Sequence, residues 1–285
     1  MEVVQPIKRN VLLNPGPATT TDTVKYAQVV PDICPREQEF VDIMTQVRQD
    51  LVKVVHGDPE KYTAVIFTGS GTIIQDVLVN SLVPDKKKIC VINNGAYAAR
   101  MVEIAKYYHI PCVDLKFPST GLPDLGSVRE TLEKDEDITM VMAVHHETGT
   151  GVLNPIKEIG AIAHDHGCIF AVDTISTYGL KPIDIEAENI DFLMSSAQKG
   201  MAAMTGASWT VGNIEEIKKS KDYPSRSNYS NLYMQNDFFE RVVEMHYNPP
   251  FHTVNAIKKA IDEYIKEEEI DSWERLTQRR EPIHK

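Results

Sequence analysis

The chain has 285 residues, 42% hydrophobic and 25% charged, which is the composition of a globular protein with a large buried core. Its formal net charge of −11 argues against general binding to nucleic acid or anionic membranes, because phosphates need a basic surface. The sequence contains no apolar run near the ~18 residues of a membrane-spanning helix, no signal-peptide core and no CxxC pair, so we expect a cytoplasmic protein without a structural metal.

A strand followed by a glycine-rich turn and a helix is the first motif along the chain. Before it, the apolar run at residues 11–17 is stopped by two prolines and a glycine, and apolar residues recur at helical spacing over residues 37–55. Residues 63–67 form a predicted buried strand, residues 68–72 read TGSGT, and a helical pattern covers residues 73–82. Such a turn presents backbone N–H groups to an anion, although a tight turn that needs glycine explains it equally well.

The rest of the chain alternates strands and helices. Predicted strands cover residues 88–93, 111–115, 139–144, 168–172, 192–194 and 207–211. Predicted helices cover residues 98–108, 125–134, 156–166, 214–221, 238–247 and 253–268. Because most of the strands are continuously apolar, the pattern predicts an α/β fold with a mostly parallel sheet covered by helices on both faces.

Polar clusters follow the predicted strands at their carboxyl ends, where ligand sites form in open parallel sheets. The clusters are residues 69–72, 94–97, 145–148, 173–176 and 195–199. Because these ends meet at one edge of the sheet, the clusters together predict a ligand site there.

Lys199 is the most unusual residue of this predicted edge. It follows a short apolar strand and precedes small residues and methionines, and an apolar setting favours the neutral, nucleophilic amine of a lysine. Pyridoxal phosphate, held by such a lysine as a Schiff base, also needs a carboxylate for its pyridinium nitrogen and an aromatic side chain for its ring. Asp173 and Tyr97 meet those needs, although a surface lysine, a helix-capping aspartate and a loop tyrosine are the plainer interpretations.

Seven segments of the chain resemble fold-type I, class V pyridoxal-phosphate aminotransferases. They read LLNPGPATTT, TGSGT, NNGAYAARM, HHETGTGVLNPI, AVDTIS, SSAQKG and NPPFHTV. The lysine and Asp-x-x-Ser segments are typical of the class, and the first, third and fourth segments are similar to the 2-aminoethylphosphonate–pyruvate transaminases. The resemblance implies transamination of 2-aminoethylphosphonate with pyruvate, in either direction, as a step of phosphonate metabolism.

The resemblance also implies roles around the cofactor. Lys199 would carry pyridoxal phosphate and move a proton to and from the substrate carbon, while Asp173 would pair with the pyridine nitrogen and Tyr97 would stack on the ring. Thr148 would hydrogen-bond the phenolic oxygen, and Ser176 would lie beside the ring. The residues expected at the phosphate are Ser70, Gly71, Thr72 and Gln198, with Thr253 reaching the phosphate of the neighbouring subunit in a homodimer with shared active sites.

By the same resemblance, residues 1–250 form a large cofactor-binding domain with an N-terminal segment, and residues 251–285 begin a truncated C-terminal domain. In the family, that domain supplies an arginine that binds the phosphonate or carboxylate of the substrate. Neither Arg279 nor Arg280 matches that segment, and Arg36 is a candidate replacement with a surface salt bridge as its plainer role.

Three other interpretations stay open. The chain could be a class V aminotransferase of the serine– or alanine–glyoxylate type, or a truncated cofactor-binding remnant with little activity. A nucleotide-binding module is the third, although the TGSGT turn lacks both the lysine of a Walker loop and the third glycine of a dinucleotide fingerprint.

Overall fold

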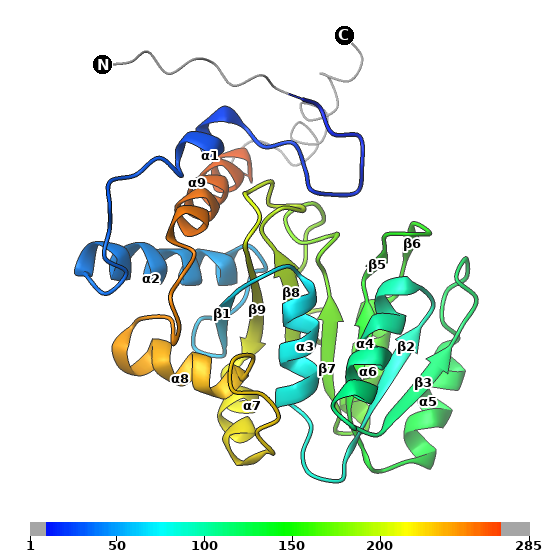
Figure 1. The fold of residues 1–285 in the computed structure, drawn as a ribbon. Helices are drawn as coiled ribbons and strands as arrows, with labels where there is room; N and C mark the ends of the chain where they lie inside the picture. Colours follow the sequence, from blue (N-terminus) through cyan, green and yellow to red (C-terminus); the bar gives the residue numbers. More distant parts are fainter. Residues whose placement is uncertain (1–9, 269–285) are drawn as a thin grey trace.

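The structure is a computed structural model that describes residues 10–268, and its centre is a seven-stranded sheet in the order β1-β9-β8-β7-β4-β2-β3 (Figure 1). The strands are β1 (Tyr62–Thr68), β2 (Lys88–Asn93), β3 (Cys112–Lys116), β4 (Ile138–Val144), β7 (Ile169–Asp173), β8 (Phe192–Ser196) and β9 (Ala207–Asn213). The α/β fold with a mostly parallel sheet is therefore confirmed.

Strand direction decides where the polar clusters meet. Strands β8, β7, β4, β2 and β3 pair in parallel, and β9 is antiparallel to both of its neighbours, β8 and β1. In this register Asp173 on β7 pairs with Val144 on β4 and with Met194 on β8. Because β9 reverses direction, residues 197–206 turn back at the carboxyl edge without a crossover helix, and Lys199 stays at that edge.

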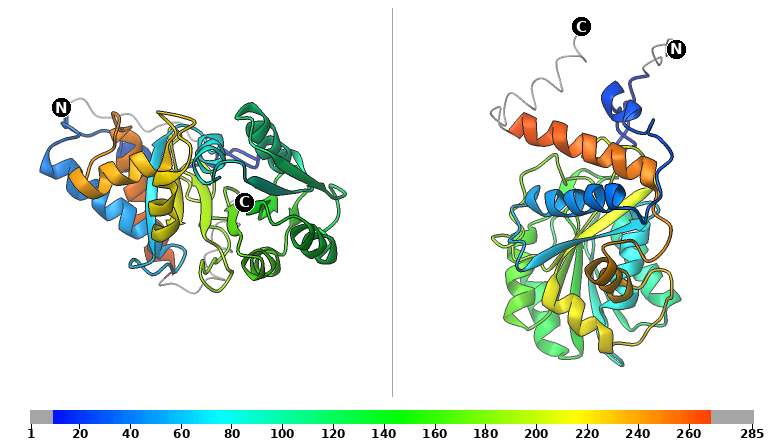
Figure 2. Two further views of the ribbon diagram at one scale, coloured as in Figure 1. Left: turned by 90° about the horizontal axis from the view of Figure 1, so that it is seen from below. Right: turned by 90° about the vertical axis from the view of Figure 1, so that its left-hand side faces the viewer.

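Helices cover both faces of the sheet, with α3 and α4 on one face and α5 and α6 on the other (Figures 1 and 2). Helix α2 packs on β1 at the edge of the sheet, and α9 packs on α2. The helices are α1 (Asp22–Tyr26), α2 (Gln38–Lys53), α3 (Thr72–Ser81), α4 (Ala96–Tyr107), α5 (Leu125–Lys134), α6 (Ile156–Asp165), α7 (Ile214–Lys219), α8 (Leu232–Val242) and α9 (Phe251–Glu268), with a 3₁₀ turn η1 (Ser220–Asp222).

The core explains why the central strands are apolar along almost their whole length. Strands β4 and β8 lie between two helical layers, so their side chains are buried on both faces of the sheet. Tyr178 and Trp209 meet edge to face with their ring centroids 5.5 Å apart, and the Tyr178 hydroxyl donates to the Leu51 carbonyl at 2.6 Å. The buried aromatic side chains thereby tie α2 to the sheet.

Two local features differ from the sequence prediction. The helix predicted over residues 238–247 is α8, which begins earlier because the Asn231 side chain accepts a hydrogen bond from the Met234 N–H. It also ends earlier, since Val243 adopts a left-handed conformation with φ of 56°. The polar cluster after β4 folds into a hairpin, β5 (His146–Glu147) and β6 (Val152–Leu153), that the sequence pattern did not predict.

Helix α9 buries its apolar face, including Val254, Ile257 and Ile261, in the same hydrophobic cluster as the sheet. The proposed domain boundary after residue 250 stays a prediction. The segment that precedes α1 passes over the carboxyl edge of the seven-stranded sheet (Figure 1). Within residues 10–268, no helix combines the length and apolar character needed to cross a membrane.

Candidate functional site

Lys199 lies in the turn that follows β8, at the carboxyl edge of the sheet. Its side chain is partly buried, and its Nζ donates a hydrogen bond to the Pro15 carbonyl at 3.3 Å. The Ala18 N–H donates to the carbonyl of the preceding residue, Gln198, at 2.8 Å. The N-terminal segment therefore packs over the lysine, and this arrangement leaves the amine only partly exposed.

Asp173 ends β7 and is only 4% exposed. Its Oδ1 accepts from the Ile175 N–H at 2.9 Å, and its Oδ2 accepts from the Gln75 side-chain amide at 2.7 Å. Burial raises the pKa of Asp173 to about 6, and these two hydrogen bonds offset only part of that rise. A cation placed beside this carboxylate would be strongly stabilised.

The TGSGT turn connects β1 to α3 as predicted. Gly71 precedes the first residue of α3 and provides no side-chain cap. The Ile73 and Ile74 N–H groups donate to the Ser70 and Gly71 carbonyls at 2.9 and 3.0 Å, so a ligand here would be met by the N–H groups of the turn residues before them. A β carbon on Gly71 would lie 2.5 Å from Ile175 Cδ1 and 3.4 Å from Ser196 Oγ. The glycine thus lets the turn approach the ends of both β7 and β8, which carry the predicted ligand residues.

Tyr97, in the first turn of α4, is held from two sides. Its N–H donates to Glu147 Oε1 at 3.0 Å, and the Arg100 guanidinium carbon lies 5.1 Å from the centroid of its ring. Arg100 also donates from Nη1 to Thr72 Oγ1 at 3.2 Å. The predicted stacking residue and the predicted phosphate residue are therefore linked through Arg100.

Thr148 and Ser176 come from different loops and meet directly. Their hydroxyl oxygens lie 2.6 Å apart, in the β5–β6 hairpin and in the loop after β7. The hairpin is anchored by Asn154, whose side chain exchanges two hydrogen bonds with Asn94, at 2.8 and 3.1 Å. This anchoring holds Thr148 beside Ser176, which follows Asp173 by three residues.

Thr253 lies at the start of α9 and is 8% exposed. Its hydroxyl donates to the Thr205 carbonyl of the same chain at 3.1 Å, beside Gly206. The Gly206 carbonyl in turn accepts from the Gly69 N–H at 3.0 Å. Thr253 is thus connected to the TGSGT turn of its own chain, and its contact with a neighbouring subunit stays a prediction.

Gln75, Arg100 and Glu147 contact the predicted residues but were not predicted. Arg100 belongs to the NNGAYAARM segment, and Gln75 is a buried amide in an otherwise apolar helix, so both carried a weak signal.

Arg36 pairs with Glu244 at 3.4 Å and its side chain is 79% exposed, which agrees with a surface salt bridge. Arg279 and Arg280 lie outside the described residues.

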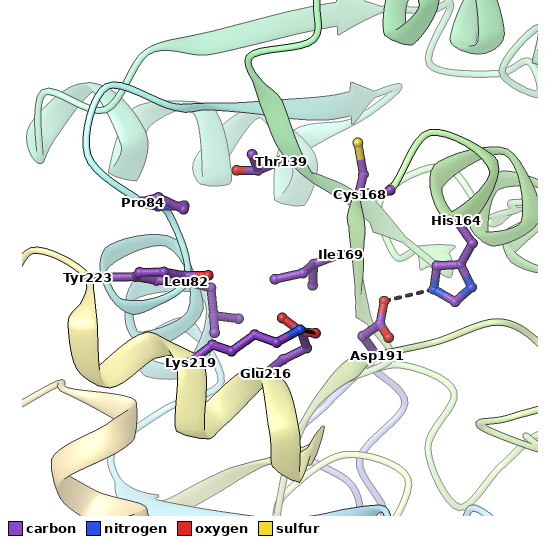
Figure 3. Close-up of a pocket in the computed structure, with 11 residues that line it drawn as sticks. Leu82, Pro84, Thr139, His164, Cys168, Ile169, Asp191, Glu216, Lys219 and Tyr223 are labelled. Atoms are coloured by element: carbon purple, nitrogen blue, oxygen red, sulfur yellow. Dashed lines mark hydrogen bonds and ion pairs between the residues drawn. The ribbon is translucent and has the colours of Figure 1, made fainter.

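Two hollows open on the described part of the molecule. One, of about 340 Å³, lies beside the N-terminal segment and is lined in part by Gln198. The other, of about 380 Å³, lies at the amino ends of β4, β7 and β8, the opposite edge of the sheet (Figure 3). Two basic side chains that line it already have acidic partners, His164 with Asp191 at 2.8 Å and Lys219 with Glu216 at 2.5 Å, and no predicted site residue lines it.

Known proteins resemble this chain over most of its length. The family profile described as aminotransferase class-V matches residues 20–278. A 2-aminoethylphosphonate–pyruvate transaminase of Lysinibacillus sphaericus is 35% identical over 256 residues, which cover 90% of this chain and 69% of that protein. A bifunctional phosphonoacetaldehyde hydrolase/aminoethylphosphonate transaminase of Clostridioides difficile is 36% identical over 92% of this chain, which spans 41% of that longer protein.

Solved structures show the same fold at lower sequence identity. An alanine–glyoxylate aminotransferase from Nostoc sp. superposes with a TM-score of 0.85 at 23% identity, covering 96% of this chain and 72% of that one. An aspartate aminotransferase of subgroup IV from Thermus thermophilus superposes with a TM-score of 0.82 at 21% identity, covering 94% and 73%. The chain has the fold of these enzymes, and it belongs to the class-V aminotransferase family.

Proposed function

We propose that this protein is a pyridoxal-phosphate-dependent transaminase that moves the amino group of 2-aminoethylphosphonate to pyruvate. The products are phosphonoacetaldehyde and alanine, and the reaction can run in either direction. The observation that carries the proposal is the placement of Lys199 and the buried Asp173 at the ends of adjacent parallel strands. The match to 2-aminoethylphosphonate–pyruvate transaminases over about nine-tenths of the chain supports this choice of substrate.

The residues of the site fit pyridoxal phosphate. Asp173 is a buried carboxylate with a raised pKa, and the protonated ring nitrogen of the cofactor would offset the cost of burying its charge. Ser196 Oγ and Gln198 Oε1 are buried without a hydrogen-bond partner among the described residues, which suits side chains that face a polar ligand. Tyr97 offers a half-buried ring to one face of the cofactor.

In this proposal Lys199 has two tasks. Its amine would hold the cofactor covalently, and once the substrate amine has replaced it, it would accept the proton from the substrate carbon that bears the nitrogen. When bound, pyridoxal phosphate withdraws electrons from that carbon and makes the proton acidic. Asp173 would keep the ring nitrogen protonated, and Tyr97 would pack against the ring.

The remaining residues orient the cofactor and shield it. The hydroxyls of Thr148 and Ser176, 2.6 Å apart, are placed to serve the phenolic oxygen. The phosphate is assigned to the start of α3 and the turn after β8, through Ser70, Gly71, Thr72 and Gln198. The N-terminal segment over Lys199 restricts the access of water to the amine.

We also propose a cytoplasmic homodimer in which Thr253 contributes to the phosphate site of the partner. Val11 and Leu13 in the segment above the carboxyl edge are 66% and 81% exposed, and burial of such side chains stabilises a subunit interface. Light scattering at micromolar protein concentration tests the dimer. A stable monomer that holds the cofactor would contradict it.

The main rival is a transaminase of the serine– or alanine–glyoxylate type, which the fold of the Nostoc enzyme also suits. Adding each amine alone to cofactor-loaded protein separates the two, because the first half of the reaction shifts the cofactor absorbance. We expect a rapid shift with 2-aminoethylphosphonate, a slow one with serine or alanine, and none in Lys199→Ala. Equal rates for the three amines would contradict the phosphonate assignment, and bound cofactor with no shift would favour an inactive remnant.

A further inference from the structure

We propose that Arg100 supplies the positive charge of the phosphate site and orients Thr72 within it, so that the protein selects the phosphorylated form of its cofactor. This inference rests on the proposed function, because it concerns the same cofactor. Arg100 would act as a positioning residue through Thr72, and the following contacts support that role.

Arg100 joins two elements that approach the cofactor from different directions. It lies one turn after Tyr97 on α4, and its guanidinium carbon is 5.1 Å from the Tyr97 ring centroid. Its Nη1 reaches across to α3 and donates to Thr72 Oγ1 at 3.2 Å. A single side chain therefore ties the residue assigned to the ring to a residue assigned to the phosphate.

The hydrogen bond from Arg100 also determines what Thr72 can do. A threonine hydroxyl has one hydrogen to donate and two lone pairs to accept with. Because Arg100 donates to the oxygen, the hydroxyl hydrogen of Thr72 stays available as a donor at the start of α3. The start of α3 has no side-chain cap, and its Ile73 and Ile74 N–H groups donate to the Ser70 and Gly71 carbonyls. The Thr72 hydroxyl therefore adds a donor at the positive end of the helix dipole, which suits an anion.

The charge balance of the edge requires a cation. In the proposed function the ring nitrogen of the cofactor offsets the charge of Asp173, but Glu147 is a second buried acidic side chain here, and a phosphate group adds about −1.5 to −2 charges near neutral pH. The amine of Lys199 is committed to the cofactor in the proposed function. Arg100 lies near enough to Asp173 to lower the pKa of that carboxyl slightly, whereas Glu147 raises it. Arg100 is thus placed to offset the repulsion that the phosphate would meet.

A purely structural role for Arg100 makes a different prediction. If the side chain only braced α4 against α3, its loss would lower stability and weaken every ligand to the same degree. If it serves the phosphate, its loss must weaken pyridoxal 5′-phosphate much more than pyridoxal, which has the same ring and carbonyl but no phosphate. The ratio of the two affinities therefore separates the two roles without any measurement of turnover.

The test compares Arg100→Gln with Arg100→Lys, Thr72→Val and the control Arg129→Gln, whose side chain pairs with Asp165 on the surface at 3.3 Å. Dissociation constants for pyridoxal 5′-phosphate and pyridoxal are measured by absorbance titration, and folding is checked by thermal unfolding. We expect Arg100→Gln to lose about 10- to 100-fold in affinity for the phosphorylated ligand and less than about threefold for pyridoxal. Arg100→Lys and Thr72→Val should fall between wild type and Arg100→Gln, and Arg129→Gln should match wild type.

Several results would overturn the inference. An equal loss for both ligands, or an Arg100→Gln protein that keeps the wild-type preference for phosphate, would show that Arg100 does not serve the phosphate. If Arg100→Gln does not fold, an unchanged preference in both Arg100→Lys and Thr72→Val would have the same meaning. A wild-type protein that binds neither ligand would contradict the proposed function itself. If the wild-type protein binds both ligands but has no transaminase activity, the ratio of the two affinities in the variants still decides whether Arg100 serves the phosphate.

Discussion

Gly16 and Lys199 are in such close contact that a side chain on Gly16 would require the lysine side chain to move. A β carbon on Gly16 would collide with Lys199 Cδ and lie 2.8 Å from Nζ. Gly16 also has a φ of 133°, which L-residues with a side chain rarely adopt. The N-terminal segment is therefore shaped around the lysine that we assign to the cofactor.

Replacing Gly16 by alanine should displace either the lysine or the segment above it. We expect Gly16→Ala to bind pyridoxal phosphate about tenfold more weakly than wild type, a loss of about 1.4 kcal/mol. An absorbance titration of the cofactor-free protein measures this affinity. Gly149→Ala is the control, since its β carbon would meet no atom within 4 Å and its φ is not in the strained range. Equal affinity in both variants would show that this contact does not shape the site.

Asp173 makes the cofactor-free protein sensitive to pH. Its folded-state pKa of about 6 lies above the ~3.9 of an aspartate in an unfolded chain. The folded state then binds more protons than the unfolded state between these values, so stability falls as the pH rises through this window and stays reduced above it. Above this window the raised pKa lowers the free energy of unfolding by up to about 3 kcal/mol, at ~1.4 kcal/mol per pKa unit.

Asp173→Asn should remove this pH-dependent loss of stability, because asparagine does not ionise. Gln75 Oε1 is buried without a partner among the described residues, so the Gln75 amide can rotate and accept from the new asparagine. We expect the cofactor-free variant to exceed wild type in stability by up to about 3 kcal/mol at pH 8 and by almost nothing at pH 4, although it should lose transaminase activity. Urea unfolding across this range measures the difference, with the exposed Asp165→Asn as control. A difference that does not change with pH would contradict the explanation.

Asn154 should be essential for the hairpin that carries Thr148. It exchanges two hydrogen bonds with Asn94 and donates to the Val144 carbonyl at 2.8 Å, all in buried positions. Asn154→Ala leaves these partners unsatisfied and should cost about 3 kcal/mol. The melting temperature should fall by roughly 6–12 °C.

Asn228→Ala is the matched control for that experiment, because Asn228 is exposed and bonds the Tyr247 hydroxyl at the surface. Its loss should change stability by less than about 0.5 kcal/mol. Similar melting temperatures for the two variants would mean that the asparagine pair is not what holds the hairpin in place.

Most of the fold could be predicted because strands and helices leave local signals. The continuously apolar run before Asp173 and the one after Asp191 predict buried parallel strands, and parallel strands bring their carboxyl ends to one edge. Asp173, Tyr97 and Lys199 could be grouped for that reason, before any contact between them was known. The helix α8 could not be bounded in the same way, because its start depends on a single side-chain cap at Asn231.

The residues that were missed act through tertiary contacts. Gln75 reaches Asp173 from the body of α3, and Glu147 reaches the Tyr97 N–H from a hairpin. Neither contact follows from periodicity, since each joins residues far apart in the chain. The packing of Gly16 on Lys199 joins residues even further apart, and the local PGP pattern indicates a turn without indicating what lies beneath it.

The central claim is that Lys199 carries the cofactor, and mass spectrometry of the reduced protein tests it most directly. Borohydride makes the link between a lysine amine and the pyridoxal phosphate carbonyl permanent, so the modified peptide can be identified after digestion. We predict one pyridoxyl-phosphate group per chain on Lys199 in the wild-type protein, and no modification in Lys199→Ala. A modification at another lysine, or none in cofactor-saturated wild type, would contradict the account.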